Sequence, residues 1–150
     1  KQLLNIPVKH PIKEGRKRTK DTLIDNDSLW QDHHFKSLKT AYRTSPFLTT
    51  FKHDIAHIFE KKHKYLQDLN IDSFLFIMDA LQLNSNFTKT LEYKTAAIKE
   101  DFRHPSEVKN QPEKLVDTYI QMFDDKHGFI PNLSILDLLF MEGPNTISFL

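Results

Sequence analysis

The chain has 150 residues, a formal net charge of +1 and no cysteine. This nearly neutral charge argues against a dedicated nucleic-acid binder, which usually carries a marked basic excess, so we expect no DNA partner. The lack of cysteine excludes disulfides, thiol catalysis and cysteine-based zinc sites. The longest apolar run, residues 74–78, is far shorter than the roughly 20 residues that cross a bilayer, so we expect no membrane span and a cytoplasmic location.

Residues 3–25 predict a hairpin that carries a long basic loop. Residues 3–8 alternate weakly between apolar and polar side chains, and residues 22–24 indicate the returning strand. The loop between them, residues 9–20, holds six cations against one acidic side chain. Such a run is most often solvated surface, although an Arg side chain can also bind phosphate through two parallel hydrogen bonds. Both interpretations stay open, and the candidate phosphate ligands are Arg16, Lys17 and Arg18.

A first helix is predicted to end near Tyr42. Ser28 and Gln31 form a capping-box pattern at its start. Four residues then recur at helical spacing and are predicted to share one buried face. They are Trp30, His34, Leu38 and Ala41.

Two more helices, a strand and a loop follow. Ser45 and Pro46 predict an N-cap with proline at the first position of a second helix. A third helix is expected over residues 64–81. Residues 87–93 are β-branched and aromatic enough to predict a strand, and the polar residues 95–112 predict a loop over a site.

Residues 127–144 combine helix start and stop signals with polar side chains. Ser134 predicts an N-cap, and Asp137 three residues later predicts the acidic half of a capping box. A short apolar helix follows, and a Gly-Pro pair ends it. His127 and Asn132 precede this helix, near the positive end of its dipole, where anionic ligands are favoured.

Together these elements predict an α+β fold. It is mainly helical, with three or more helices packed on a small sheet. The length fits a single domain over residues 1–150.

Two blocks of sequence resemble the WbqC-like protein family. The first motif block, residues 30–47, contains Trp30, His34-Phe35-Lys36-Ser37-Leu38, Ala41-Tyr42 and Ser45-Pro46-Phe47. The second motif block, residues 127–144, contains His127-Gly128-Phe129-Ile130-Pro131-Asn132-Leu133-Ser134-Ile135-Leu136-Asp137-Leu138-Leu139-Phe140, followed by Glu142-Gly143-Pro144. The resemblance implies that the chain is the C-terminal portion of a WbqC-like protein, with the family's N-terminal segment missing.

The same resemblance implies a glycine (aminoacyl) transferase that acts on an amino sugar in bacterial surface-polysaccharide (O-antigen) biosynthesis. A sugar amine would attack an activated glycyl carbonyl, which requires a base and hydrogen-bond donors for the oxyanion. The expected partners are a nucleotide-sugar or another phosphorylated small molecule and an aminoacyl carrier, with no cofactor. The candidate catalytic bases are His34 and His127. The candidate substrate-binding residues are Lys36, Tyr42, Asn132, Arg16, Lys17 and Arg18.

Each candidate also has a purely structural interpretation. His34 can be a hydrogen-bonded core histidine, and Tyr42 can pack its ring instead of contacting a ligand. His53 and His57 flank an acidic residue at helical spacing, which resembles the zinc-protease pattern with Asp in place of Glu. We interpret this pair as exposed and expect no metal site. If the motifs serve only capping and packing, the chain is a non-catalytic binding or scaffold module.

Overall fold

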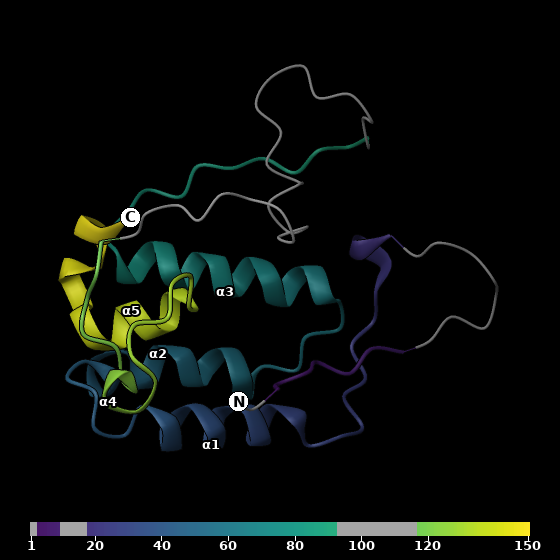
Figure 1. The fold of residues 1–150 in the computed structure, drawn as a ribbon. Helices are drawn as coiled ribbons and strands as arrows, with labels where there is room; N and C mark the ends of the chain where they lie inside the picture. Colours follow the sequence, from purple (N-terminus) through teal and green to yellow (C-terminus); the bar gives the residue numbers. More distant parts are fainter. Residues whose placement is uncertain (1–2, 10–17, 93–116) are drawn as a thin grey trace.

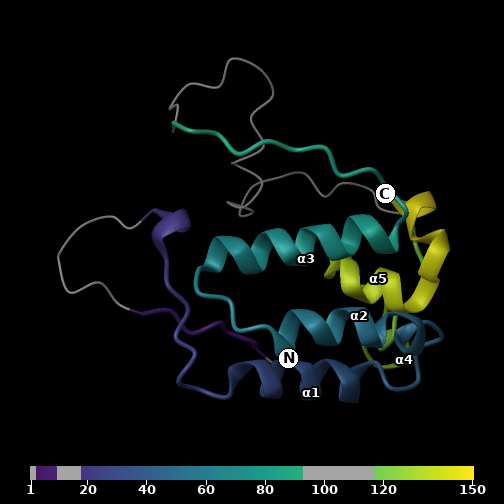
Figure 2. The ribbon, with the colours of Figure 1, turned by 180° about the vertical axis from the view of Figure 1, so that it is seen from behind.

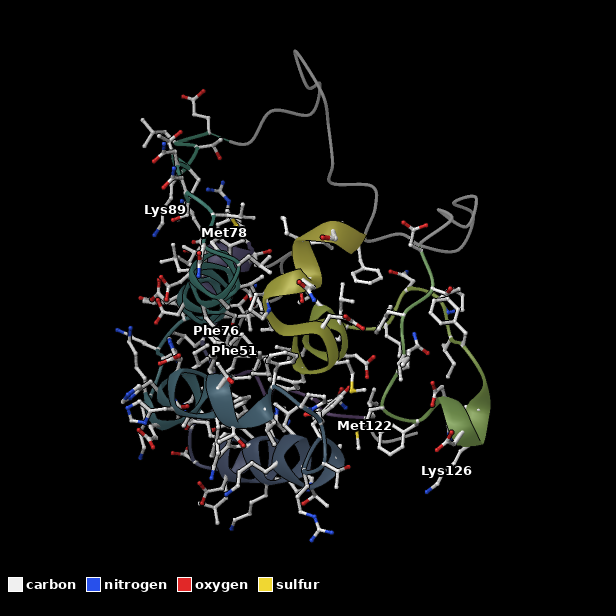
Figure 3. The ribbon with its side chains drawn as sticks, turned by 90° about the vertical axis from the view of Figure 1, so that its left-hand side faces the viewer. Phe51, Phe76, Met78, Lys89, Met122 and Lys126 are labelled. Carbon is white, nitrogen blue, oxygen red and sulfur yellow. The ribbon has the colours of Figure 1, made fainter. Side chains whose placement is uncertain are left out.

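The computed structural model describes residues 3–9, 18–92 and 117–150. Figure 1 shows α1, α2 and α3 side by side, and Figure 2 shows the same layer from behind. In Figure 3, α5 packs against one face of this layer and α4 lies farther out. No helix of the described residues is long and apolar enough to cross a membrane. The helices, with η marking a 3-10 helix, are η1 Thr19–Asp21, α1 Trp30–Ala41, α2 Leu48–Glu60, α3 Leu66–Ala80, α4 Asp124–His127, α5 Ile135–Glu142 and η3 Gly143–Phe149.

The predicted α+β fold is wrong, because the described residues contain helices and no strand or sheet. The expected hairpin is reduced to an isolated antiparallel bridge between Val8 and Ile24, and a second bridge joins Leu23 to Tyr65. Ile24 interacts with two different segments of the chain. It forms the bridge with Val8, but its N–H donates to the Lys64 carbonyl at 3.0 Å. A proline, which has no N–H, also precedes the first bridge and prevents a longer ladder there.

The strand predicted at residues 87–93 is wrong where the structure describes it. Residues 87–92 are exposed and have no regular secondary structure. An extended segment with no neighbouring strand cannot pair its backbone groups, so local β propensity alone does not make a strand. The predicted loop at residues 95–112 and residues 10–17 of the basic loop lie outside the described residues.

α1 confirms the first predicted helix. Its N-cap is Leu29 instead of Ser28, and the helix ends at Ala41. Trp30 and His34 are buried, each with 6% of its surface exposed. The other two residues of the predicted face are only half-buried, so burial is strongest in the first half of the helix.

α2 begins later than predicted. Its N-cap is Phe47, and Ser45 instead donates its hydroxyl to the Tyr42 carbonyl at 2.8 Å. Ser45 therefore closes the end of α1, and the predicted helix start at Pro46 is wrong. α3 confirms the third predicted helix.

Two apolar clusters hold the described helices together. Figure 3 shows Phe51 and Phe76 between α2 and α3. Full burial of one large apolar side chain stabilises a fold by about 1.5–3 kcal/mol, so the completely buried residues of α5 make a major contribution. The larger cluster joins α2 to α5 and consists of Leu48, Phe51, Ile55, Leu139 and Phe140. The smaller cluster consists of Ile24, Trp30 and Leu69.

Candidate functional site

The two motif blocks meet where α5 packs beside the end of α1. The Tyr42 hydroxyl donates to Oδ1 of Asp137 at 3.0 Å, although the two residues are 95 positions apart in sequence. The Phe47 N–H donates to the Phe140 carbonyl at 3.0 Å. The rings of Tyr42 and Phe140 also make an edge contact, with centroids 5.1 Å apart. Residues of the two motif blocks therefore form one joint in space.

Asp137 is the centre of this joint. Only 2% of its surface is exposed, and its second oxygen, Oδ2, accepts a hydrogen bond from the Tyr119 hydroxyl at 2.9 Å. The predicted capping box is therefore wrong in its acidic half, because both carboxylate oxygens point to tyrosines. Its other half is confirmed, since the Ser134 hydroxyl accepts from the Leu136 N–H at 3.3 Å.

The pKa values of both tyrosine hydroxyls are raised above the ordinary value. Burial, followed by the nearby Asp137 charge, raises the pKa of Tyr42 above its ordinary value of 10.0. Burial and the hydrogen bond to Asp137 raise the pKa of Tyr119 to about 12. At neutral pH each hydroxyl is therefore a donor to the carboxylate, and this joint holds three segments together without exchanging protons.

A glycine is required where the second motif block turns out of α5. Gly143 has a φ of +55°, which side chains other than glycine rarely adopt. A Cβ at this position would lie 2.5 Å from Cδ1 of Phe47. The close approach of these two residues fixes the end of α5 against the start of α2.

The loop that contains the predicted polar residues of the second motif block is clamped by Gln121. This buried side chain donates to the Ile130 carbonyl and accepts from the Ile130 N–H, each at 2.8 Å. His127 ends α4, and its side chain is exposed. Asn132 is also exposed and has a φ of +58°. The clamp therefore presents both predicted side chains to solvent on a fixed backbone.

His34 lies in a different environment. It is buried beside Trp30, and its Nε2–H donates to the Asn5 carbonyl at 3.1 Å. Burial lowers its pKa below the ordinary value of 6.5, so the ring is neutral at pH 7. This geometry is that of a hydrogen-bonded core histidine. No hydrogen bond joins His34 to His127 in the part of the chain that the structure describes.

Lys36 lines a groove of about 630 Å³ on the outer surface of α1 and α2. We call this groove the cationic groove because four of the seven residues that line it are Lys or Arg. Among the described residues, no carboxylate forms an ion pair with any of these four cations. Its lining residues are Lys36, Lys39, Thr40, Arg43, Leu48, Thr49 and Lys52.

The comparison with protein families matches the WbqC-like family model over residues 1–110. The chain belongs to the WbqC-like protein family. The match is to the N-terminal part of this chain and includes the first motif block, while the second motif block lies beyond it. No curated protein and no solved structure matches the chain. Membership in the WbqC-like family suggests a role in polysaccharide biosynthesis.

Three cations of the groove are not among the residues predicted for the WbqC-like site. Lys36 and Lys39 are three residues apart and lie on one stripe of α1, and Arg43 follows in the turn after this helix. That spacing is a signal that the sequence does contain. Lys52 lies on α2, and its position beside the stripe depends on how the two helices pack.

The predicted phosphate ligands of the basic loop are only partly described. Arg16 and Lys17 lie outside the described residues. Arg18 is exposed at the start of η1, where its carbonyl accepts from the Asp21 N–H at 3.0 Å. Its guanidinium role therefore stays a prediction.

Proposed function

We propose that this WbqC-like chain binds a phosphorylated sugar in the cationic groove and acts as a glycine (aminoacyl) transferase on an amino sugar in bacterial surface-polysaccharide (O-antigen) biosynthesis. Family membership supports the class of pathway. The cationic groove is the observation that carries the class of substrate.

The charges of the groove favour a phosphorylated ligand. Four like charges on α1, on the turn after it and on α2 repel one another, and an anion between them removes that repulsion. Arg43 can hold a phosphate through paired N–H donors, whereas the lysines act as point charges. The Thr49 hydroxyl can donate to or accept from a sugar, whereas the Thr40 hydroxyl donates to the Lys36 carbonyl at 2.8 Å and can accept from a sugar. The groove volume, about 630 Å³, lies within the usual range for small-molecule sites.

In the proposed reaction, the amine nitrogen of the sugar attacks the carbonyl carbon of an activated glycyl group. A new C–N bond forms, the bond to the aminoacyl carrier breaks, and the amine loses a proton to a base. His127 is the better candidate for this base, because its ring is exposed while His34 is buried and bonded to backbone. The exposed amide of Asn132 is the proposed donor to the developing oxyanion.

The proposed partners are a nucleotide-sugar and an aminoacyl carrier, and a cytoplasmic location is part of the same proposal. Tyr42 supports the site indirectly, since its hydroxyl is already used by Asp137. The basic loop with Arg16, Lys17 and Arg18 is a second proposed contact for the phosphates.

A calorimetric titration tests the groove. We expect a UDP-linked amino sugar and inorganic pyrophosphate to bind, and the double variant Lys36→Ala with Arg43→Ala to bind at least about tenfold more weakly, because two charged hydrogen bonds are lost. A double variant of exposed lysines outside both the groove and the basic loop, Lys62→Ala with Lys89→Ala, is the control with the same change in net charge. Equal weakening in both variants would show only a general charge effect. The triple variant Arg16→Ala, Lys17→Ala and Arg18→Ala tests the loop separately.

The non-catalytic binding module is favoured by one observation, the backbone-bonded position of His34. Transfer of labelled glycine to the sugar distinguishes the two functions. A transferase should lose roughly a hundredfold in turnover on His127→Gln while keeping its affinity for the sugar. Binding without transfer in the unaltered chain would identify the binding module instead.

A further inference from the structure

Two histidines of α2 converge on a single point at the protein surface. His53 and His57 are separated by one helical turn, and both are exposed. Their Nε2 atoms lie 3.2 Å apart, and the rings make an edge contact with centroids 4.6 Å apart. Exposed imidazoles can hydrogen-bond to water instead of to each other. Their convergence therefore places two ring nitrogens where both can bind one shared ligand.

The separation of the two nitrogens suits a metal ion. Two Zn–N bonds of about 2.0–2.1 Å that meet at a tetrahedral angle place their nitrogens roughly 3.3 Å apart. The distance in the structure is 3.2 Å, so a metal can enter with little movement of either ring. A pair of His residues at positions i and i+4 of a helix is also a recurring zinc-binding arrangement.

Neighbouring charges prepare His57 as a ligand. Oε2 of Glu60 lies 3.5 Å from Nδ1 of His57, so the carboxylate favours a proton on Nδ1 and leaves a lone pair on Nε2. Metal-binding histidines usually have such an outer carboxylate or carbonyl partner. The cation that follows one turn later, Lys61, is held by Asp72 on α3.

We propose that His53 and His57 chelate a divalent first-row transition metal ion such as Zn²⁺ at the surface of α2. In the metal-free chain one Nε2–H donates to the other Nε2, and this hydrogen bond is replaced by two metal–nitrogen bonds. His53 then carries its proton on Nδ1, so no proton is released. The described residues contain no group of three or more metal-binding side chains, which makes this a two-ligand site with water at its other positions.

This proposal revises the expectation of no metal site. That expectation rested on the Asp that replaces the zinc-protease Glu and on the exposed position of both histidines. A two-ligand chelate requires only the helical spacing and the correct ring rotations, which the structure supplies.

Titration with Zn²⁺ alone, followed by calorimetry, tests the site. We expect His53→Ala and His57→Ala each to weaken binding at least tenfold, and Glu60→Gln to weaken it on the order of tenfold through its outer contact. The matched control is His33→Ala with His127→Ala, which removes two exposed histidines elsewhere. Circular dichroism should show unchanged helix content, because all of these side chains lie at the surface.

A second readout uses Cu²⁺ as a probe. Electron paramagnetic resonance should show coupling to two imidazole nitrogens in the unaltered chain and to one in either single variant. Unchanged Zn²⁺ affinity in the His53→Ala, His57→Ala double variant would overturn the proposal. Equal losses in the control variant would overturn it as well, since binding would then come from scattered histidines.

Discussion

At the scale of single residues, burial decides what each polar group can do. His34 and His127 are the same residue type in the two motif blocks, yet one is enclosed and bonded to the Asn5 carbonyl while the other faces water. An enclosed imidazole resists protonation because the charged form loses its hydration. An exposed imidazole keeps access to substrates and to solvent protons.

Acidification should therefore destabilise the fold through His34. Its folded-state pKa lies below the unfolded value of 6.5, so in that window the unfolded chain binds more protons and the free energy of unfolding falls as the pH falls. Denaturant unfolding between pH 7 and pH 5 measures this slope. His34→Gln should flatten it, because the titrating group is gone. The exposed neighbour gives the control variant, His33→Gln, and equal slopes in all three chains would contradict the prediction.

At the scale of elements, helix positions follow from local pattern, whereas their ends and partners depend on distant residues. The repeat of Trp30 and His34 was sufficient to predict α1. Ser45 looked like an N-cap in sequence, but its hydroxyl is taken by the Tyr42 carbonyl. The expected sheet failed for a similar reason, since the backbone at Ile24 pairs with the linker before α3. A local sequence pattern contains no information about such long-range competitors.

The residues of the candidate site also fall into two groups, those that a local sequence pattern predicts and those whose positions depend on distant contacts. Lys36 was predicted from the first motif block, Lys39 follows it at helical spacing, and Arg43 lies in the turn just after α1. Lys52 could not be predicted, because only the packing of α2 on α1 brings it to the groove. Asp137 was expected to be the acidic half of a capping box. Its buried contacts with Tyr42 and Tyr119 required knowledge of the whole chain.

The turn after α5 provides a test at this scale. Gly143→Ala should lower the free energy of unfolding by about 3 kcal/mol or more, because it combines backbone strain with a steric clash against Phe47. Gly128→Ala is the matched control, since its φ of +67° is also unfavourable for alanine but no atom lies within 4 Å of the new Cβ. It should cost about 1–2 kcal/mol from strain alone. Equal losses in chemical denaturation would mean that the Phe47 contact carries no steric cost.

At the scale of the whole molecule, the C-terminal segment completes the core of the helical layer. Leu139 and Phe140 are entirely buried, and they pack with Phe51 and Ile55 of α2. Without them, α2 would present an apolar face to water. The layer of α1, α2 and α3 is therefore incomplete as a folding unit.

A chain that ends at Glu92 should keep part of its helix but lose cooperative unfolding. Near-ultraviolet circular dichroism should weaken and binding of a hydrophobic dye should rise, as in a collapsed state without fixed packing. Addition of a separate peptide of residues 117–150 should restore the near-ultraviolet signal, because it supplies both α5 and Asp137. A truncated chain that unfolds as sharply as the full chain would contradict this view of the core.

The joint between Tyr42 and Asp137 also sets the order in which the protein can be assembled. Its partners are 95 positions apart, and closing so long a loop carries a larger entropic cost than the contacts between successive helices. During synthesis, α1, α2 and α3 leave the ribosome well before Asp137 and Phe140. The nascent chain must therefore carry an exposed apolar face until α5 has been synthesised, and aggregation during this interval is a hazard that the finished fold does not have.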